Sequence, residues 1–302
     1  MSDVRSRAEE LYRTLQASIC AGLERLDGQA RFGRDAWERS ATPGSASGDG
    51  GGGLTRVLAD GALLEKAAVN VSAVWGPMPP ALAKQLEVSG GEFFATGVSM
   101  IFHPRNPHAP TAHANLRYFE TEGGRWFGGG CDLTPYYLYE EDARHFHATL
   151  RAACERHPAG DYPAWKAWCD RYFFLDHRGE ARGVGGVFFD HLQGDPEALL
   201  ALQADLGEAI LAAYGPLLTR RAATPWGPAE ERWHLQRRGR YVEFNLVHDR
   251  GTKFGLVSGG RTESILVSLP PRVRWDYDAR PAPGTPEHRL LELLSGPPRD
   301  WT

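Results

Sequence analysis

The chain has 302 residues, of which 42% are hydrophobic and 24% are charged, and its formal net charge is -4. This composition is that of a globular protein that buries a core without disulfides, and the charge gives no reason to expect nucleic-acid binding. The charged N-terminus lacks the apolar segment of a secretory signal, and no run of 18 apolar residues predicts a membrane span. The four cysteines contain no C-x-x-C pair, which argues against a zinc site or a disulfide scaffold. We therefore expect a cytoplasmic protein.

The N-terminal part begins with a predicted helix and continues with a glycine-rich stretch. Residues 3–27 place apolar side chains at helical spacing, which predicts an amphipathic helix. Residues 42–53 are rich in Gly, Ser and Pro and end in four glycines. A phosphate-binding loop would continue with Lys and Ser or Thr, whereas Leu54 follows here. We interpret residues 42–53 as a mobile surface loop that could serve as a lid.

The rest of the chain has the pattern of strands in hairpins with helices grouped between them. Turn signals at residues 249–251 and 258–260 predict that the last three strands form an antiparallel meander. This order indicates an α+β fold, with one domain over residues 1–302 and an antiparallel sheet covered by helices. The predicted elements are strands at 64–74, 93–103 and 113–120, helices at 140–157, 164–175 and 196–214, and strands at 241–248, 252–257 and 261–269.

One strand carries an unusual set of polar side chains. Alternation puts His113, Asn115 and Arg117 on one face of the strand at 113–120. A solvated sheet face is the alternative, but such a face more often carries Lys, Glu and Thr. Three hydrogen-bonding side chains of different chemistry, beside the small residues Ala112 and Ala114, indicate the floor of a binding site.

Histidines raise the question of a metal site. By the same alternation, His103 shares a strand face with Ser99. In the helix at 140–157, His147 falls on the apolar face and points inward, where a lone histidine is more often a satisfied core residue than a ligand. Four histidines could bind a metal ion together, but their spacing does not establish that they meet. They are His103, His113, His147 and His177.

An aspartate and an arginine complete the candidate residues. Asp132 follows three glycines, which let a backbone approach a ligand closely. Alternatively, Asp132 is a turn or N-cap residue before Pro135. Arg261 follows Gly259 and Gly260 at the predicted start of a strand. There it could bind a carboxylate through its guanidinium fork, or it could be an ordinary surface arginine in a turn.

Several strings of residues together resemble the oxygen-dependent coproporphyrinogen III oxidase family. They occur in order over nearly the whole chain, so the resemblance is far more specific than one short motif would make it. The strings are HPRNPHAPT at 103–111, HANLRYF at 113–119, WFGGGCDLTP at 126–135, GVGGVFFD at 183–190, RGRYVEFNLV at 238–247 and GGRTES at 259–264.

The resemblance implies a homodimer whose subunit has a large antiparallel sheet, helices on both sides of it and a deep substrate cleft. It implies that residues 241–276 lie at the dimer interface. His113 matches the proposed proton donor, and the four histidines named above match positions described as ligands of a divalent metal. The reaction is nevertheless usually described as needing no metal and no organic cofactor. The substrate-binding positions would be Ser99, Asn115, Arg117, Gly259, Gly260 and Arg261.

The resemblance also supplies a hypothesis for the reaction, in which two of the four propionates of coproporphyrinogen III become vinyl groups and O₂ accepts the electrons. Arg117 and Arg261 would bind propionates, and Asp132 would accept hydrogen bonds from pyrrole N–H groups. His113 would act as acid or base, because histidine titrates near neutral pH. The candidate catalytic residues are therefore His113, Asp132 and Arg117. Two other classes stay open: a metal-dependent oxygenase with histidine ligands, and a tetrapyrrole carrier without catalytic activity.

Overall fold

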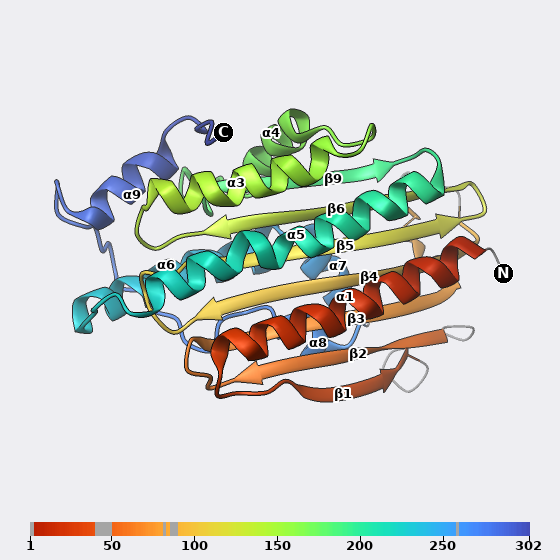
Figure 1. Cartoon of the computed structure of the whole chain (residues 1–302), viewed down its shortest axis with the longest axis horizontal. Helices are drawn as coiled ribbons and strands as arrows, with labels where there is room; N and C mark the ends of the chain where they lie inside the picture. The colour runs from red at the N-terminus through yellow and green to blue at the C-terminus, as the bar shows by residue number, and fades with distance from the viewer. Residues whose placement is uncertain (1–2, 40–49, 81–82, 85–89, 258–259) are drawn as a thin grey trace.

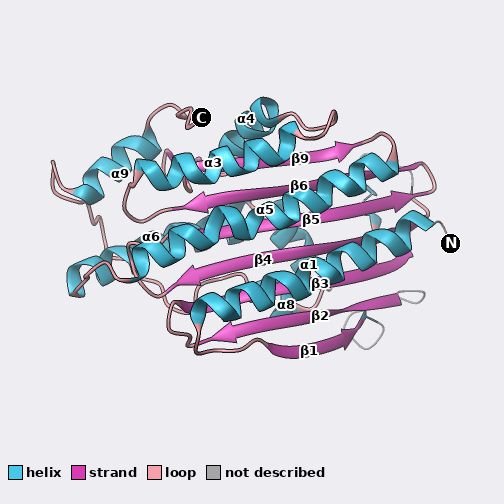
Figure 2. Ribbon diagram, viewed as in Figure 1, coloured by secondary structure: helices cyan, strands magenta, loops and turns pink. Residues whose placement is uncertain are grey.

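A large antiparallel sheet organises the computed structural model of the chain, which describes residues 3–39, 50–80, 83–84, 90–257 and 260–302 (Figures 1 and 2). Within these residues the sheet has seven strands in the order β1-β2-β3-β4-β5-β6-β9, and each strand is antiparallel to its neighbours. The predicted α+β class and antiparallel sheet are confirmed. The strands are β1 (Gly33–Glu38), β2 (Gly50–Ala59), β3 (Leu64–Pro77), β4 (Glu92–Pro104), β5 (Thr111–Thr121), β6 (Gly124–Thr134) and β9 (Gly185–Leu192).

One face of the sheet, which we call the core face, carries the main hydrophobic core. The helices α1 (Asp3–Asp27), α5 (Pro196–Ala222) and α3 (Glu140–Glu155) lie side by side over it (Figure 1). Every second residue of β5 from Ala112 to Tyr118 is buried beneath these helices. The predicted helix at 3–27 is confirmed, because it forms α1 and buries its apolar side chains in this core.

Shorter elements complete this side and the ends of the sheet. The helix α4 (Tyr162–Tyr172) packs on β9, and β7 (Phe174–Leu175) pairs with β8 (Glu180–Ala181) in a separate small hairpin. The helices α6 (Pro228–Glu243) and α9 (Pro286–Ser295) lie toward one end of the sheet (Figure 1). The predicted helices at 140–157, 164–175 and 196–214 correspond to α3, α4 and α5.

Among the described residues, α5 is the one helix long and apolar enough to cross a membrane. However, 61% of its most apolar window is buried inside the protein, between α1 and α3 on the sheet. Its apolar character is therefore explained by its place in the core.

The opposite face of the sheet, which we call the polar face, is covered by residues 244–257 and 260–269, the cover segment. This segment forms the π-helical turn η2 (Phe244–His248) and the helices α7 (Arg250–Val257) and α8 (Thr262–Leu266). The prediction of three strands at 241–248, 252–257 and 261–269, arranged as a meander, is therefore wrong. Helices lie on both sides of the sheet, with α7 and α8 behind it in Figure 1.

Asp249 explains part of this error. Its side-chain Oδ2 accepts a hydrogen bond from the backbone N of Thr252 at 2.6 Å, and its backbone O accepts one from Lys253 N at 3.2 Å. Aspartate suits both a hairpin turn and the N-terminus of a helix, and here it begins α7. The aspartate that was interpreted as part of a hairpin turn is therefore the cap of a helix.

Hydrogen bonds from strands of the sheet hold the cover segment against the polar face. The Thr55 and Ser264 hydroxyls are 2.8 Å apart, and Asn70 Nδ2 donates to the backbone O of Ser264 at 3.1 Å. Lys66 Nζ donates to the backbone O of Leu269 at 2.8 Å. These bonds fix α8 above strands β2 and β3, at one side of the polar face.

The glycine-rich stretch predicted as a loop at 42–53 is in part a strand. Residues 50–53 begin β2 and pair with β3, and residues 42–49 lie outside the described residues. Gly51 has a φ of +92°, and a Cβ atom there would lie 2.0 Å from the backbone O of Ala73. Glycine at this position therefore permits the close approach of two strands.

Candidate functional site

The middle of the polar face is an open floor of small and polar residues. The strand register places Ser99 of β4 beside Asn115 of β5, and Asn115 beside Gly130 of β6. Ser99 lies in the middle of an inner strand and is nevertheless exposed, while His113, Asn115 and Arg117 are partly exposed. The cover segment therefore leaves the centre of the polar face accessible. The prediction that His113, Asn115 and Arg117 share one face is confirmed.

Arg117 is held above this floor by two neighbours. Its Nη1 donates to Asn115 Oδ1 at 2.8 Å, and its Nη2 lies 2.9 Å from Asp190 Oδ2 on β9. A Cβ atom on Gly128 would lie within 2.7 Å of both Asp190 Oδ1 and Arg117 Nε, so the glycine makes room for this ion pair. The Arg117 side chain is still 35% exposed, which leaves donors available to a carboxylate of a ligand.

Asp132 lies at the buried end of the same face and is 2% exposed. Both of its carboxylate oxygens accept hydrogen bonds from Arg182 Nη2, at 2.8 and 2.7 Å. Its Oδ1 also lies 2.9 Å from His113 Nδ1. Asp132 is an internal residue of β6, so the alternative that it is a turn or N-cap residue is wrong.

The electrostatic setting of Asp132 decides which atom of His113 is left for a ligand. Burial alone would raise the pKa of Asp132, but the Arg182 guanidinium and the hydrogen bond from His113 hold that pKa below its usual range. The ionised carboxylate only accepts hydrogen bonds, so His113 Nδ1 must donate to it. Among the described residues, His113 Nε2 has no hydrogen-bond partner, and this atom is the one available to a bound molecule.

His103 and His147 are both buried, and both ring nitrogens of each histidine have a hydrogen-bond partner. His103 contacts a threonine hydroxyl at 3.2 Å and the backbone O of Ser268 at 2.9 Å. His147 points into the core face, as predicted, and contacts Tyr162 OH at 2.7 Å and Val184 O at 3.0 Å. Burial lowers the pKa of His147 to about 3, so the neutral ring donates from Nε2 to the carbonyl and accepts from the phenol.

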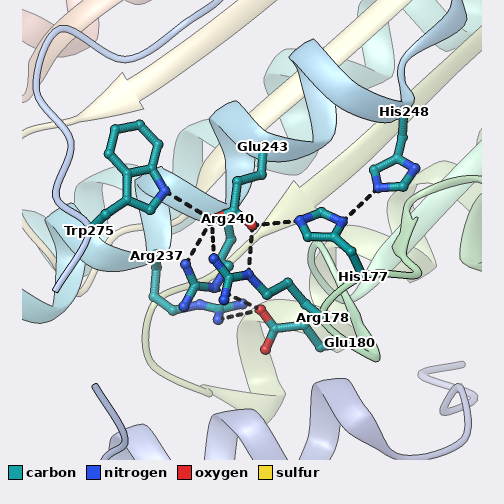
Figure 3. Close-up of polar contacts among 8 residues, drawn as sticks. All are labelled: His177, Arg178, Glu180, Arg237, Arg240, Glu243, His248 and Trp275. Atoms are coloured by element: carbon teal, nitrogen blue, oxygen red, sulfur yellow. Dashed lines mark hydrogen bonds and ion pairs between the residues drawn. The ribbon is translucent and has the colours of Figure 1, made fainter. Parts of the chain in front are cut away.

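His177 lies in a different cluster, shown in Figure 3. Its Nδ1 is 2.8 Å from His248 Nε2, and its Nε2 is 2.8 Å from Glu243 Oε2. Arg178 donates to both carboxylate oxygens of Glu243, at 2.7 and 2.8 Å. Burial alone would raise the pKa of Glu243, but these bonds from Arg178 and His177 lower it to about 2.

The structure does not bring the four predicted metal-binding histidines together. His103 and His113 are on the polar face, His147 is on the core face and His177 follows β7 in the cluster of Figure 3. Within the described part of the chain, no group of three or more His, Cys, Asp or Glu side chains is arranged to hold a metal ion. These four residues therefore do not fit a single ion, and we derive no step that uses one.

Arg261 is on the same side of the sheet as Arg117, but at its edge. It is the N-cap residue of α8, and not the start of a strand as predicted. Its Nη2 lies 2.6 Å from Asp35 Oδ2, and its Nη1 donates to Ser264 Oγ at 3.2 Å. Since α8 contacts β2 and Arg117 is on β5, three strand spacings, or roughly 14 Å, separate the two regions across the sheet.

The two glycines predicted to bind substrate divide between the described and undescribed residues. Gly260 N donates to the backbone O of Gly255 at 2.8 Å, which joins the end of α7 to the start of α8. Gly259 lies outside the described residues. The residues that the structure gathers on the polar face are Ser99, His113, Asn115 and Arg117 at its centre, Asp132 at its buried end and Arg261 at its edge.

Comparison with known families gives a match over almost the whole chain. The sequence model of the family described as Coproporphyrinogen III oxidase matches residues 7–301. The chain belongs to this family. The resemblance of the six strings to coproporphyrinogen III oxidases is confirmed, and the match covers essentially the whole chain. The family is a family of enzymes of porphyrin and haem biosynthesis that act on coproporphyrinogen III.

A separate cleft of about 580 Å³ lies beside α6 of this coproporphyrinogen oxidase. Arg237 and Arg240 line it, together with the exposed Trp275. The two arginines pair with Glu180 and Glu243, at 2.8 and 2.9 Å (Figure 3).

Two side chains at the centre of the site were missed by the sequence interpretation. Arg182 directly precedes the GVGGVFFD string and Asp190 ends it, so both were close to residues that carry the resemblance. Spacing could not reveal them, because their partners Asp132 and Arg117 are on other strands that only the fold brings near. The one signal in the sequence was an arginine directly before a glycine-rich string.

Proposed function

We propose that this enzyme is an oxygen-dependent coproporphyrinogen III oxidase that converts two propionates to vinyl groups and yields protoporphyrinogen IX. The observation that carries the proposal is the open centre of the polar face, where Asn115 and Arg117 lie beside the accessible Nε2 of His113. A large ligand with several carboxylates matches a floor with one arginine at its centre and another at its edge.

The reaction removes one CO₂, one proton and two electrons from each propionate side chain. The C–C bond to the carboxylate breaks, a hydrogen leaves the neighbouring carbon, and a carbon–carbon double bond forms between the two remaining carbons. Two such steps supply four electrons, which reduce one O₂ to two molecules of water with the uptake of four protons. The protein must therefore hold the propionate, exclude competing reactions and move a proton.

Arg117 and Arg261 are the residues that would hold propionates. In the described structure they pair with Asp190 and Asp35, so an incoming carboxylate shares or replaces these partners. A charge-assisted hydrogen bond contributes about 1.5–3 kcal/mol, which is enough to orient one arm of the macrocycle. Ser99 and Asn115 add neutral hydrogen-bonding groups on the floor between them.

Asp132 takes a different part from the one first expected. Direct acceptance of pyrrole N–H bonds does not fit a carboxylate that is 2% exposed and already bonded to Arg182 and His113. We assign Asp132 the orientation of His113, whose Nε2 then accepts or returns the proton lost from the propionate. In this assignment His113 contacts the substrate, and Asp132 holds the imidazole of His113 in place without contacting the substrate.

The cysteines favour O₂ as the electron acceptor over an oxygen-independent reaction. Iron–sulfur clusters are held by neighbouring cysteine thiolates. In this chain Cys20, Cys131, Cys154 and Cys169 are on α1, β6, α3 and α4, and each is buried and free. They do not form such a ligand set. Buried free thiols also agree with the reducing cytoplasm that we propose as the location of the enzyme.

An aerobic assay tests the proposal. Purified enzyme is incubated with coproporphyrinogen III, with and without a strong chelator, while O₂ uptake, CO₂ release and protoporphyrinogen IX are measured. We expect one O₂ consumed for two CO₂ released, and no effect of the chelator. Product formed equally well without O₂ would contradict the oxygen-dependent reaction, and loss of activity with the chelator, restored by metal, would favour a metal-dependent oxygenase. Binding without any turnover would indicate a carrier.

We also propose a homodimer formed through the cover segment. Leu246 and Val247 of η2 and Leu256 of α7 are each at least 40% exposed, so this segment presents apolar side chains to solvent. Sedimentation equilibrium tests this proposal. Twice the chain mass is expected for the wild type, and Leu246→Asp with Val247→Asp should give the chain mass.

A further inference from the structure

Arg182 and Asp132 form an ion pair that is almost completely enclosed. The side chains are 1% and 3% exposed, and one nitrogen of Arg182, Nη2, reaches both carboxylate oxygens at 2.8 and 2.7 Å. Arg182 follows the β7–β8 hairpin, whereas Asp132 is on β6, so the pair joins two separate parts of the fold. A buried arginine bonded in this way fixes both the position and the rotation of the carboxylate.

Three aromatic rings surround the Arg182 guanidinium and keep it in place. Its central carbon lies 3.9 Å from the ring centroid of Phe173, 4.7 Å from Tyr241 and 4.6 Å from Phe244. Phe173 follows α4, Tyr241 is on α6 and Phe244 begins η2. The guanidinium is thus enclosed by rings from both sides of the site, including the first residue of the cover segment.

The geometry extends from this pair to His113. Asp132 Oδ1, which Arg182 holds, is the atom 2.9 Å from His113 Nδ1. Because the ionised carboxylate only accepts hydrogen bonds, this contact requires the His113 tautomer with the proton on Nδ1, and that tautomer leaves Nε2 as an acceptor for a ligand on the floor. Arg182 itself has no access to the floor, since its side chain is buried behind Asp132.

We propose that Arg182 is a positioning residue that acts through Asp132 to fix the tautomer and orientation of His113. This inference rests on the proposed function only in assigning proton transfer to His113; the orientation of the imidazole can be measured without any turnover. Arg182 makes no contact with substrate, so its replacement should lower kcat and leave KM nearly unchanged. The aromatic rings also connect the cover segment to the site, because Phe244 packs on the same guanidinium.

The test compares Arg182→Gln, Arg182→Lys and the control Arg178→Gln. Arg178 belongs to the same hairpin and pairs with Glu243 in the more exposed cluster of Figure 3, so the control removes an arginine from the hairpin without touching Asp132. The imidazole ¹⁵N spectrum of His113 is recorded for each variant, and kcat and KM for coproporphyrinogen III are measured with O₂ saturating.

In the wild type we expect a hydrogen-bonded proton on His113 Nδ1. Arg182→Gln should lose this single tautomer and lower kcat roughly 10²-fold or more, which is the contribution typical of a positioned acid or base. Its KM should stay within about threefold of the wild-type value, because Arg182 does not contact the substrate and acts only through His113. Arg182→Lys should restore part of kcat and of the Nδ1 signal, because lysine keeps the charge but not the planar guanidinium that the three rings enclose. Arg178→Gln should leave both kcat and the Nδ1 signal of His113 unchanged.

Two results would overturn the proposal: an unchanged His113 tautomer in Arg182→Gln, or a Lys variant no better than the Gln variant in either measurement. If Arg182→Gln does not fold, Phe244→Leu provides the second route, since it loosens the enclosure and keeps the charge. It should weaken the Nδ1 signal in the same direction, and an unaltered signal would contradict the proposal. Should the wild type show the Nδ1 tautomer but no turnover, the proposed function fails and the positioning of His113 stands.

Discussion

The two faces of the sheet differ by a single residue step along each strand, yet they have opposite chemical character. On β5, Ala114 and Leu116 are buried beneath α1 and α5, whereas Asn115 and Arg117 lie on the accessible polar face. The core face is closed by long helices with apolar contacts. Among the described residues, the polar face is covered by α8 over β2, by Tyr241 of α6 on β3 and β4, and by η2 and the end of α4 near β9, while Ser99 stays exposed. One strand thus serves both stability and ligand binding, and the two functions should respond to different substitutions.

The strongest test that the two faces have separate functions is the substitution Asp132→Asn on the polar face. The amide keeps the shape of the carboxylate but loses the charge that pairs with Arg182 and sets the His113 tautomer. We expect kcat/KM to fall roughly 10³- to 10⁴-fold, as when a histidine is left in the wrong tautomer. Circular dichroism should show a folded protein. Asp205→Asn, which alters an exposed pair with Arg156, is the matched control and should retain activity. Near-normal turnover by Asp132→Asn would refute the assignment.

On the core face, Leu116→Ala should do the reverse. Leu116 is 2% exposed and directly precedes Arg117 in the chain. Removing its side chain creates a cavity, which lowers the free energy of unfolding by about 2–5 kcal/mol. We expect a lower urea midpoint with kcat/KM within a few-fold of the wild type. If kcat/KM of the folded variant instead falls as much as its stability does when both are expressed as free energies, or more, the two faces are not independent.

A smaller effect is expected from Arg117→Ala on the polar face. Loss of a charge-assisted contact with a propionate should weaken substrate binding by about 1.5–3 kcal/mol, with a modest change in stability because Arg117 is partly exposed. Equilibrium binding of coproporphyrin III, measured by fluorescence, gives the affinity directly. Arg144→Ala, on the exposed side of α3, is the control. Equal affinities of wild type and Arg117→Ala would argue against propionate binding at this residue.

The smallest expected effect concerns the pH dependence of stability, to which the core face contributes through His147. Burial lowers the pKa of His147 from 6.5 to about 3. The unfolded chain therefore binds a proton at His147 more readily than the folded chain does. The contribution of His147 to stability is complete above pH 6.5 and is lost as the pH falls toward 3. Between pH 7.5 and 5 the contribution is about 1–2 kcal/mol. Urea midpoints of wild type and His147→Gln at both pH values measure it. A wild-type slope no steeper than that of the variant would contradict this contribution.

Much of the fold could be predicted because local patterns and tertiary contacts agree there. The alternation in β5 and the spacing in α1 match the faces they bury, so the strand, the helix and the shared face of His113, Asn115 and Arg117 were all predictable. Residues 50–53 were misjudged because glycine is typical of loops, whereas here it lets two strands approach closely.

The cover segment and the inner half of the site could not be predicted for two physical reasons. Asp249 suits a turn and a helix cap equally, and contacts such as those of Ser264 with the sheet, which show that helices cover the face, exist only in the folded chain. Arg182 and Asp190 matter through partners on distant strands, and spacing along one strand carries no information about them. The four histidines show the same limit, since matching positions in sequence did not mean one site in space.

The location of the substrate on the polar face is tested most directly by a crystal structure with bound coproporphyrin III, the oxidised macrocycle that keeps all four propionates. We expect the macrocycle to lie over Ser99 and Asn115, with one propionate bound to Arg117. His113 Nε2 should lie near the propionate side chain that reacts. A macrocycle bound instead in the cleft beside Arg237 and Trp275, with the centre of the polar face empty, would contradict this account.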